Sequence, residues 1–406
     1  KSQLIKTEKS NLSVFLNYRT LKYEDTNKEN EPSLNSRILY SDRYFGQLIQ
    51  TTTAYETSSG TIAQQEFTYL QVEPGQGVYM WNDYNGNGIQ ELQEFEVAPF
   101  PDLAIYVRVF LPNQVFVRTH QNRFSQALNF NFNQWQNEKG LKKFASYFYN
   151  QTSFLIERRI RRDGSNFDLN PFSKNDDELI GLNTNFRNSL FFNRGKQYHS
   201  TTYSFLINES QNLINVQFDG NQNLASLESI SAKNQSHQLQ YQHLVKKSWL
   251  FNFSGSTTST ESTSENYPNR NFEIESYQVE PKIGYLFSKN ASWDIFYEFQ
   301  QKENQIGAFE TLKQTRLGTS FTFNSEKGFS MNGEFSMYNN SYDGNALSAV
   351  GFQMLEGLQP GKNQTWRLLL QKNLTQYLDV NINYQGRNSE TSKTIHTGNI
   401  QLRAFF

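Results

Sequence analysis

The sequence predicts an all-β fold, a transmembrane antiparallel β-barrel of the bacterial outer membrane with about 16 strands, and leaves a range of about 14 to 18 open. Three observations predict it. Apolar and polar residues alternate along the chain, the alternating segments are long, and short connections alternate with long ones. Short periplasmic turns and long outside loops are typical of such barrels.

The alternation has a period of two residues. In the segment 277–287, odd positions are mostly apolar, namely Tyr277, Val279, Ile283, Tyr285 and Phe287. Similar segments begin at Leu12, Phe124, Trp249, Trp293, Phe329, Trp366, Leu378 and Ile400. Successive side chains of a strand point to opposite faces, so each segment is predicted to be a strand with one apolar and one polar face. Spacings of three and four residues are not convincing anywhere, so no amphipathic helix is expected.

Many of these segments run for roughly ten to twenty residues, whereas a strand of a soluble protein usually has about five or six. A tilted strand needs about 9–11 residues to cross a bilayer. Segment length therefore favours membrane-spanning strands. We count about thirteen crossings in 114–406 and about three more at Asn11–Tyr23, Asn35–Tyr44 and Leu48–Glu56.

The connections between the segments alternate in length from residue 124 onward. The short ones are Asn137–Gly140, Asn193–Gln197, Lys246–Ser248, Ser288–Asn290, Ser325–Gly328 and Lys372–Leu374. The long ones are Arg161–Glu178, Phe218–Ser229, Ser259–Asn271, Gln301–Glu310, Tyr342–Asn363 and Gly386–Lys393. This order predicts that the long loops face the outside and that the C-terminus is periplasmic.

The chain divides into three predicted regions. Residues 1–72 are predicted to hold N-terminal barrel strands and loops. The alternative interpretation, that this region is the end of a longer chain, is left open. Residues 73–113 form an extracellular segment with a calcium-loop-like motif, and residues 114–406 form a regular antiparallel barrel. No apolar leader stretch is found at the N-terminus, so we expect a mature or truncated chain.

Composition excludes several classes of function. The 406 residues include no Cys, which removes disulfides and Cys-ligated metals, and the formal net charge of -1 gives no reason to expect a nucleic-acid partner. Aromatic residues make up 15% of the chain although its mean hydropathy is -0.71, which argues against disorder. No run of about 18 apolar residues exists, so a helical membrane span is excluded. The sequence has none of the common catalytic motifs and no histidines at metal-ligand spacing, so we expect no enzyme.

The residues 83–94 match the spacing of a calcium-binding loop. Side-chain oxygens at Asp83, Asn85 and Asn87, the carbonyl of Ile89 and the carboxylate of Glu94 occupy its ligand positions. Gly88 stands at the sixth position, where the loop turns sharply. Asn replaces Asp at two ligand positions, so a structural site of weak affinity is expected. The alternative is a turn rich in Asn and Gly that binds nothing.

The C-terminal segment carries Ile400, Leu402, Ala404 and Phe406 on one parity. It resembles the terminal strand signal of bacterial outer-membrane proteins, and the resemblance implies recognition of Phe406 by the barrel-assembly machinery. The segments Trp81–Pro101, Met354–Asn363 and Gln401–Phe406 resemble large Bacteroidota-type outer-membrane β-barrel surface proteins of poorly characterised function. That resemblance implies fold and location, and it carries no activity or catalytic residue.

Four arginines cluster at the outer end of one predicted strand, namely Arg158, Arg159, Arg161 and Arg162. Planar guanidinium groups suit bidentate contact with phosphates, so contact with lipopolysaccharide is one interpretation. A solvated rim of charge is the other. Lipids of the outer membrane are expected partners in either case.

The polar alternate positions of the predicted strands hold Asn, Gln, Ser and Thr with scattered charged residues. This pattern predicts a pore or channel with a polar lumen. The alternative is a non-conducting membrane anchor or a subunit of a surface complex for secretion or nutrient uptake. The segment Tyr342–Asn363 includes an apolar stretch. It is interpreted as a loop that folds inward as a constriction or docks a partner outside, or else as a further strand.

Overall fold

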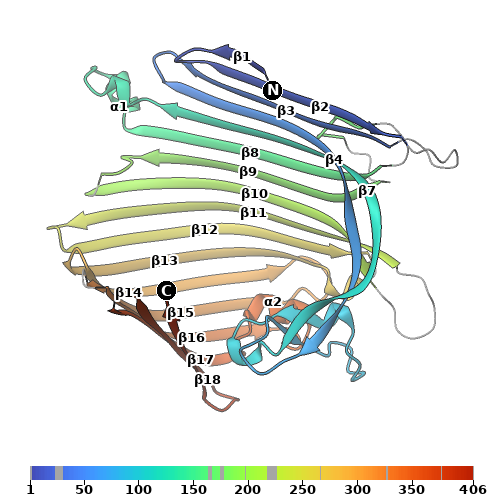
Figure 1. The fold of residues 1–406 in the computed structure, drawn as a ribbon. Coiled ribbons are helices and arrows are strands. Elements are labelled where there is room, and N and C mark those ends of the chain that lie inside the picture. The colour runs from blue at the N-terminus through green and yellow to red at the C-terminus, as the bar shows by residue number, and fades with distance from the viewer. Residues whose placement is uncertain are drawn as a thin grey trace.

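The fold is described from a computed structural model, which describes residues 2–22, 31–162, 167–173, 178–196, 198–216, 226–265, 267–325, 328–375 and 377–405. The all-β prediction is confirmed, because strands account for 70% of the described residues and form an antiparallel sheet (Figure 1). Among these residues there is no helix long and apolar enough to cross a membrane.

Seventeen strands of the described chain follow one another in the sheet. They are β1 (Ser2–Lys6), β2 (Asn11–Leu21), β3 (Glu31–Tyr44), β4 (Ile49–Gln71), β7 (Tyr106–Asn131), β8 (Phe148–Arg161), β9 (Leu179–Phe192), β10 (His199–Val216), β11 (Ser226–Val245), β12 (Trp249–Ser264), β13 (Phe272–Ser288), β14 (Ala291–Asn304), β15 (Thr311–Ser325), β16 (Phe329–Asp343), β17 (Gly361–Thr375), β18 (Leu378–Ser389) and β19 (Ile395–Ala404). The short strands β5 (Tyr79–Trp81) and β6 (Phe95–Val97) lie between β4 and β7.

Each strand of the meander pairs with the next one in antiparallel register, and β4 pairs directly with β7. In the described part of the chain, β1 pairs with β2 and β19 with β18, and no pairing joins the two edges. The sheet is therefore open, and the predicted closed barrel and its strand number are not confirmed. Before β7 the meander has one strand more than the sequence predicted, because Ser2–Lys6 pairs with β2.

The alternation along each strand separates the sheet into two faces. On β14, Trp293, Ile295 and Tyr297 are exposed on one face, whereas Phe296 and Glu298 are buried on the other. We call the first face the apolar face; on β12 to β14 its exposed residues are Trp249, Phe251, Phe253, Tyr277, Val279, Ile283, Trp293, Ile295, Tyr297 and Phe299. The opposite face carries Glu280, Lys282, Glu298 and Arg316 and is called the polar face. The two faces follow directly from the period of two.

The connections alternate in length around the sheet, with one exception. The connection between β7 and β8 spans residues 132–147 and contains the short helix α1 (Leu141–Ala145), which projects from the sheet (Figure 1). The sequence predicted only a short turn at Asn137–Gly140 there. It also predicted no amphipathic helix, and it did not identify the short helix α2 (Ala349–Leu355), which is apolar on nearly all sides.

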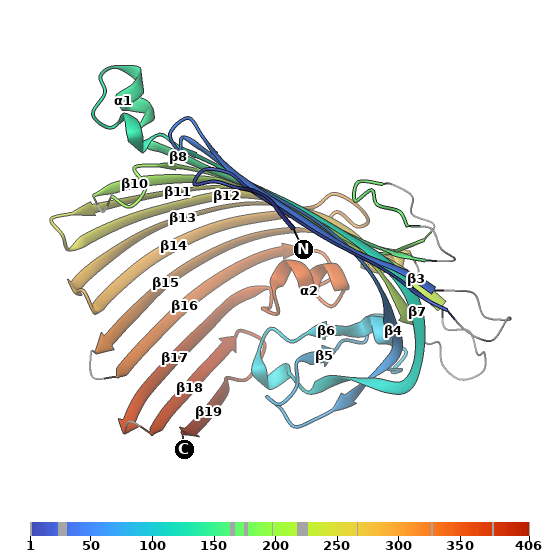
Figure 2. The same cartoon turned by 45° about the horizontal axis from the view of Figure 1, so that its top comes forward.

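Two segments lie within the curve of the sheet, over the polar face (Figure 2). The first is residues 72–105 between β4 and β7, called the insertion, which holds β5, β6 and the 3₁₀ turns η1 (Leu92–Glu94) and η2 (Pro101–Leu103). The predicted segment 73–113 ended later, because β7 already begins at Tyr106. The second is residues 344–360 between β16 and β17, called the α2 loop.

The α2 loop packs onto the polar face through a small hydrophobic core. Val350, Met354 and Leu355 of α2 contact Ile274 of β13 and Leu312 of β15. The Ser348 hydroxyl accepts a hydrogen bond from the Gly351 amide at 3.0 Å and caps the helix. The segment therefore folds inward, and it is not a further strand. Apolar residues in Ala349–Leu355 fit a period of two as well as a period of three. The periodicity alone therefore does not decide between a strand and a helix.

On the polar face, the missing side chain of Gly318 leaves space for the aromatic ring of Phe296. Phe296 of β14 stands opposite Gly318 of β15, and a Cβ on Gly318 would lie 2.2 Å from the ring. We expect Gly318→Ala to lower the free energy of unfolding by about 1–3 kcal/mol, because the ring has to move or the strands have to separate. Denaturant unfolding measures this change. Gly398→Ala is the matched control, since nothing lies within 4 Å of its added Cβ; an equal loss in both variants would contradict the steric argument.

Candidate functional site

The insertion stands on a stack of aromatic rings that continues from the sheet. Phe95 of β6 stacks on Tyr69 of β4 with ring centroids 4.0 Å apart, and its edge meets Tyr106 of β7 at 5.0 Å. Tyr69 also contacts Tyr79 of β5 at 5.0 Å. Such ring pairs contribute about 0.5–1.5 kcal/mol each beyond the area they bury. They join the small β5–β6 hairpin firmly to the β4–β7 pair.

The predicted calcium loop lies at the tip of this hairpin. The Asp83 carboxylate accepts hydrogen bonds from the amides of Gly86, Asn87 and Gly88 at 2.7, 3.2 and 2.8 Å. The side-chain carbonyls of Asn85 and Asn87 each accept from the amide two residues on, at 2.9 and 2.6 Å. The left-handed conformations that the loop needs fall on Gly86 and Gly88, where no Cβ opposes them. Hydrogen bonds from the loop's own backbone amides therefore fix the positions of the Asp83, Asn85 and Asn87 side chains.

Glu94, the predicted ligand at the twelfth position of the loop, is only 2% exposed. Its carboxylate accepts from the Trp81 indole at 2.7 Å and from the Tyr84 amide at 3.2 Å, which closes the loop. The sequence interpretation omitted Glu91, which stands at the ninth position and accepts from the Asn85 side chain at 2.8 Å. The spacing itself could have found Glu91, since the ninth position of such loops often holds the ion through a water.

Carboxylate and amide oxygens are the ligands that Ca²⁺ prefers, and the donors of this loop are of that kind. Within the described residues no group of three His, Cys, Asp or Glu side chains has the geometry to hold a metal. The loop relies on amides at two ligand positions, so its charge is low. Ile89 is exposed at the rim of the loop.

Two ion pairs tie the insertion to the sheet. Glu96 pairs with Arg270, which lies between β12 and β13, at 2.5 Å, and Asp102 pairs with Arg387 of β18 at 2.6 Å. Burial raises the pKa of the Glu96 carboxyl, although Arg270 opposes that rise. The Arg387 guanidinium also lies over the Phe100 ring, 4.2 Å from its centroid. The insertion thus reaches from the β12–β13 end of the polar face to β18.

The α2 loop is tied to the sheet by one charged contact as well. The Lys302 ammonium on β14 donates to the Met354 carbonyl at 3.0 Å and to the Glu356 carboxylate at 2.5 Å. Lys302 is 7% exposed, so the lost hydration of its charge is offset by both acceptors. The carbonyl at the end of α2 is thereby satisfied.

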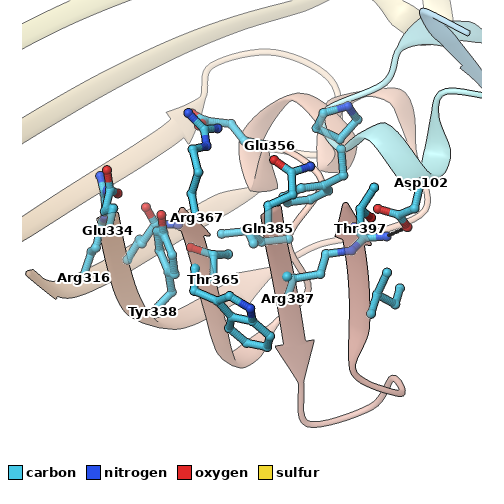
Figure 3. Close-up of a pocket in the computed structure, with 17 residues that line it drawn as sticks. Asp102, Arg316, Glu334, Tyr338, Glu356, Thr365, Arg367, Gln385, Arg387 and Thr397 are labelled. Atoms are coloured by element: carbon cyan, nitrogen blue, oxygen red, sulfur yellow. Dashed lines mark hydrogen bonds and ion pairs between the residues drawn. The ribbon is translucent and has the colours of Figure 1, made fainter. Parts of the chain in front are cut away.

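A cavity of about 410 Å³ lies where the insertion, the α2 loop and the strands β15 to β19 meet (Figure 3). Its strand side carries polar groups, namely Gln314, Arg316, Glu334, Tyr338, Thr365, Arg367, Gln385, Arg387 and Thr397. Pro99, Phe100, Asp102, Glu356 and Leu358 come from the two inward segments. Arg316 is held by Glu334 at 2.5 Å and Glu298 at 3.5 Å. The cavity thus has a mainly polar strand wall and a cover in which Pro99, Phe100 and Leu358 stand beside two carboxylates.

The four clustered arginines separate onto the two faces, as alternation predicts. Arg158 is 2% exposed and pairs with Asp168 at 2.6 Å, and Arg162 donates to the Pro32 carbonyl at 2.5 Å. Residues 167–173 cover this pair, and Phe172 packs there on Phe124 and Phe154 of the same face. Arg159 donates to Gln121 at 2.9 Å, and Arg161 ends β8. The arrangement leaves the lipopolysaccharide interpretation untested.

At the other end of the chain, Ile400 and Leu402 are 70% and 66% exposed on the apolar face of β19, and Ala404 ends that strand. Phe406, the last residue of the predicted assembly signal, lies outside the described residues. His120 is fully buried, and its ring nitrogens form hydrogen bonds with the hydroxyl groups of Thr57 and Ser59 at 2.6 and 3.1 Å. These contacts give His120 a structural role.

These features define an all-β protein with one two-faced antiparallel sheet and a polar face covered in part by two inward segments. No family model and no curated protein matches the sequence. Among solved structures, the crystal structure of the P. putida toluene transporter TodX is similar with a TM-score of 0.24 and 7% identity, over 98% of this chain and 91% of that chain. A similarity this low carries no argument about function.

Proposed function

We propose that this chain forms the wall of a bacterial outer-membrane β-barrel and acts as a pore whose polar lumen is narrowed by the insertion and the α2 loop. One observation carries the proposal: the sheet has one continuous apolar face whose aromatic and aliphatic side chains are about half exposed, with Trp293, Ile295 and Tyr297 at 45%, 46% and 45%. Exposed apolar patches on water-soluble monomers rarely exceed a few hundred Å². Hydrocarbon is the solvent that suits this face.

The proposed barrel places the apolar face toward lipid and the polar face toward water. Closure joins the open edges at β1 and β19, whose backbone groups would otherwise lack partners in a bilayer. A barrel of about 16 strands is wide enough for an aqueous lumen. The proposal assigns no catalytic step to the chain.

The orientation follows the usual plan of such barrels, with long loops outside and the C-terminus in the periplasm. Partners of the proposed barrel are outer-membrane lipids and the barrel-assembly machinery. Lipopolysaccharide phosphates are assigned to the outer end of β8, where Arg159 and Arg161 are the partly exposed members of the cluster and Arg158 and Arg162 are buried. Kinship with Bacteroidota-type surface proteins stays a prediction.

The second candidate function is a non-conducting anchor or subunit of a surface complex. It is favoured by the position of the insertion, which spans the polar face from Arg270 to Arg387. Single-channel recording in planar bilayers separates the two candidates. Discrete conductance steps from the folded chain support the pore. Folded, inserted protein without steps would overturn it, and a partner that co-purifies in fixed ratio would then support the anchor.

Calcium at the loop 83–94 is part of the same proposal, with Asp83, Asn85, Asn87, the Ile89 carbonyl and Glu94 as ligands. The Asp83 carboxylate and the buried Glu94 carboxylate supply its charge. A bound Ca²⁺ would hold the tip of the insertion in one conformation and would stabilise it by binding only the folded loop. It supplies no chemical step.

We expect millimolar calcium to raise the melting temperature of the chain, and we expect Asp83→Asn to abolish that rise. Asn removes the charge that attracts the ion. Its single acceptor oxygen also cannot replace both carboxylate oxygens, which accept from the amides of Gly86, Asn87 and Gly88, so the melting temperature without calcium falls as well. Thermal unfolding with calcium and with a chelator measures the difference. Glu73→Gln is the matched control, since Glu73 is exposed in the same insertion outside the loop. A calcium effect that is equal in all three proteins, or absent in the unmodified chain, would leave a plain turn.

A further inference from the structure

The cavity under the inward segments contains a cation that the fold does not use. Arg367 of β17 stands opposite Glu334 of β16 and opposite Gln385 of β18 in the ladder. Directly opposed residues of neighbouring strands are close enough for an ion pair. Glu334 instead pairs with Arg316 of β15 at 2.5 Å, and Ser336 also donates to it. Within the described residues Arg367 has neither an ion-pair partner nor a hydrogen-bond acceptor.

The other cations around the cavity are all engaged. Arg316 is shared between Glu298 and Glu334, Arg387 pairs with Asp102, and Lys302 pairs with Glu356. Arg367 is exposed and extends from the strand toward the side where Glu356 lies, away from the Arg316–Glu334 pair (Figure 3). Its neighbours Thr365 and Gln385 also line the cavity. A guanidinium together with an amide suits the two oxygens of a carboxylate.

The cover of the cavity combines apolar groups with paired charges. Pro99 and Phe100 of the insertion and Leu358 of the α2 loop line it, together with Asp102 and Glu356, whose carboxylates pair with Arg387 and Lys302. Phe100 is kept in place by the Arg387 guanidinium, which lies over its ring. A solute that meets both sides therefore needs an anionic group at one end and an apolar body at the other. Ligand pockets commonly combine apolar lining with a few such polar groups.

We infer that this cavity binds a small monocarboxylate with an apolar body, and that Arg367 holds its carboxylate while Pro99, Phe100 and Leu358 cover its chain. No bond is made or broken. The inference deepens the proposed function, on which it rests, because it names the class of solute that the lumen would select. A cavity of about 410 Å³ has the size of a small-molecule site.

The test uses hexanoate as the probe and its neutral analogue hexanamide, with the folded full chain in detergent and isothermal titration calorimetry. We expect hexanoate to bind and hexanamide to bind much more weakly. Arg367→Gln should weaken hexanoate binding at least about tenfold, since the hydrogen bonds from the charged guanidinium to the carboxylate are lost. Arg403→Gln is the matched control: Arg403 is an exposed arginine on the same face, far along β19 from the cavity.

Thermal unfolding of each variant shows that it is folded. Absence of hexanoate binding, equal binding of hexanamide, or an equal loss in Arg403→Gln would overturn the inference. Titration in detergent needs no conducting barrel, so the inference can fail while conductance steps are present. It can also hold in a chain that shows no conductance, in which case only the pore is refuted.

Discussion

Replacing Ile295 by arginine is expected to lower the stability of the chain in a bilayer by about 2–4 kcal/mol, which is the cost of a cationic side chain at the middle of a lipid-facing strand. Ile295 lies in the middle of β14 on the apolar face, and it stands opposite Ile283 of β13. Its side chain is 46% exposed, so arginine meets no steric obstacle there. Unfolding by denaturant from lipid vesicles measures the change.

The matched control is Gln300→Arg on the same strand. Gln300 lies on the polar face, opposite Gln278 and Gln314, where the proposal places water. We expect a change below about 1 kcal/mol for this surface substitution. Similar small effects of both variants would contradict a lipid-facing apolar face, and with it the outer-membrane barrel.

Removal of the insertion is expected to raise the single-channel conductance several-fold. Gln71 and Tyr106 are direct partners in the β4–β7 ladder, so a two-residue Asn-Gly turn can replace residues 72–105 and close the hairpin. The replaced segment lies within the curve of the sheet (Figure 2), where it narrows the proposed lumen. Planar-bilayer recording compares the two proteins.

A deletion at the opposite side of the sheet controls for the loss of a segment. Residues 132–147 connect β7 to β8 and project away from the sheet with α1 (Figure 1), so a short Gly-Ser linker in their place should leave conductance unchanged. The double variant Arg270→Gln, Arg387→Gln loses the ion pairs to Glu96 and Asp102 that hold the insertion. Its conductance should fluctuate between that of the unmodified chain and that of the chain without the insertion. Unchanged conductance after removal of the insertion would show that this segment does not obstruct the lumen.

The strands were predictable from the sequence to a large extent. Odd positions of 277–287 are apolar whatever the strand pairs with, and the structure places β13 there. Ser2–Lys6 escaped prediction because its five residues are too short to show a period. The helix α2 escaped for a different reason. Its residues are apolar on nearly all sides, and the choice between helix and strand depends on the core formed with Ile274 and Leu312.

The candidate site was predictable only in its local part. The spacing from Asp83 to Glu94 lies within one loop, so the sequence displays it, and the structure holds each of these side chains by neighbours in the same hairpin. The partners Glu96–Arg270 and Asp102–Arg387 are far apart in the chain. Nothing in the local sequence identifies them.

Alternation determines that this protein is an all-β chain with one polar and one apolar face, because the direction of a side chain on a strand is a local property. The short connections between successive strands make the sheet antiparallel. The two faces also explain why a chain with many aromatic residues has a mean hydropathy of -0.71. Tertiary contacts decide what lies over the polar face. The insertion and the α2 loop fold inward. Glu334 pairs with Arg316, and the Arg367 side chain has no ion-pair partner in the described part of the chain, because strand register and long-range packing select among partners that are equivalent in the sequence.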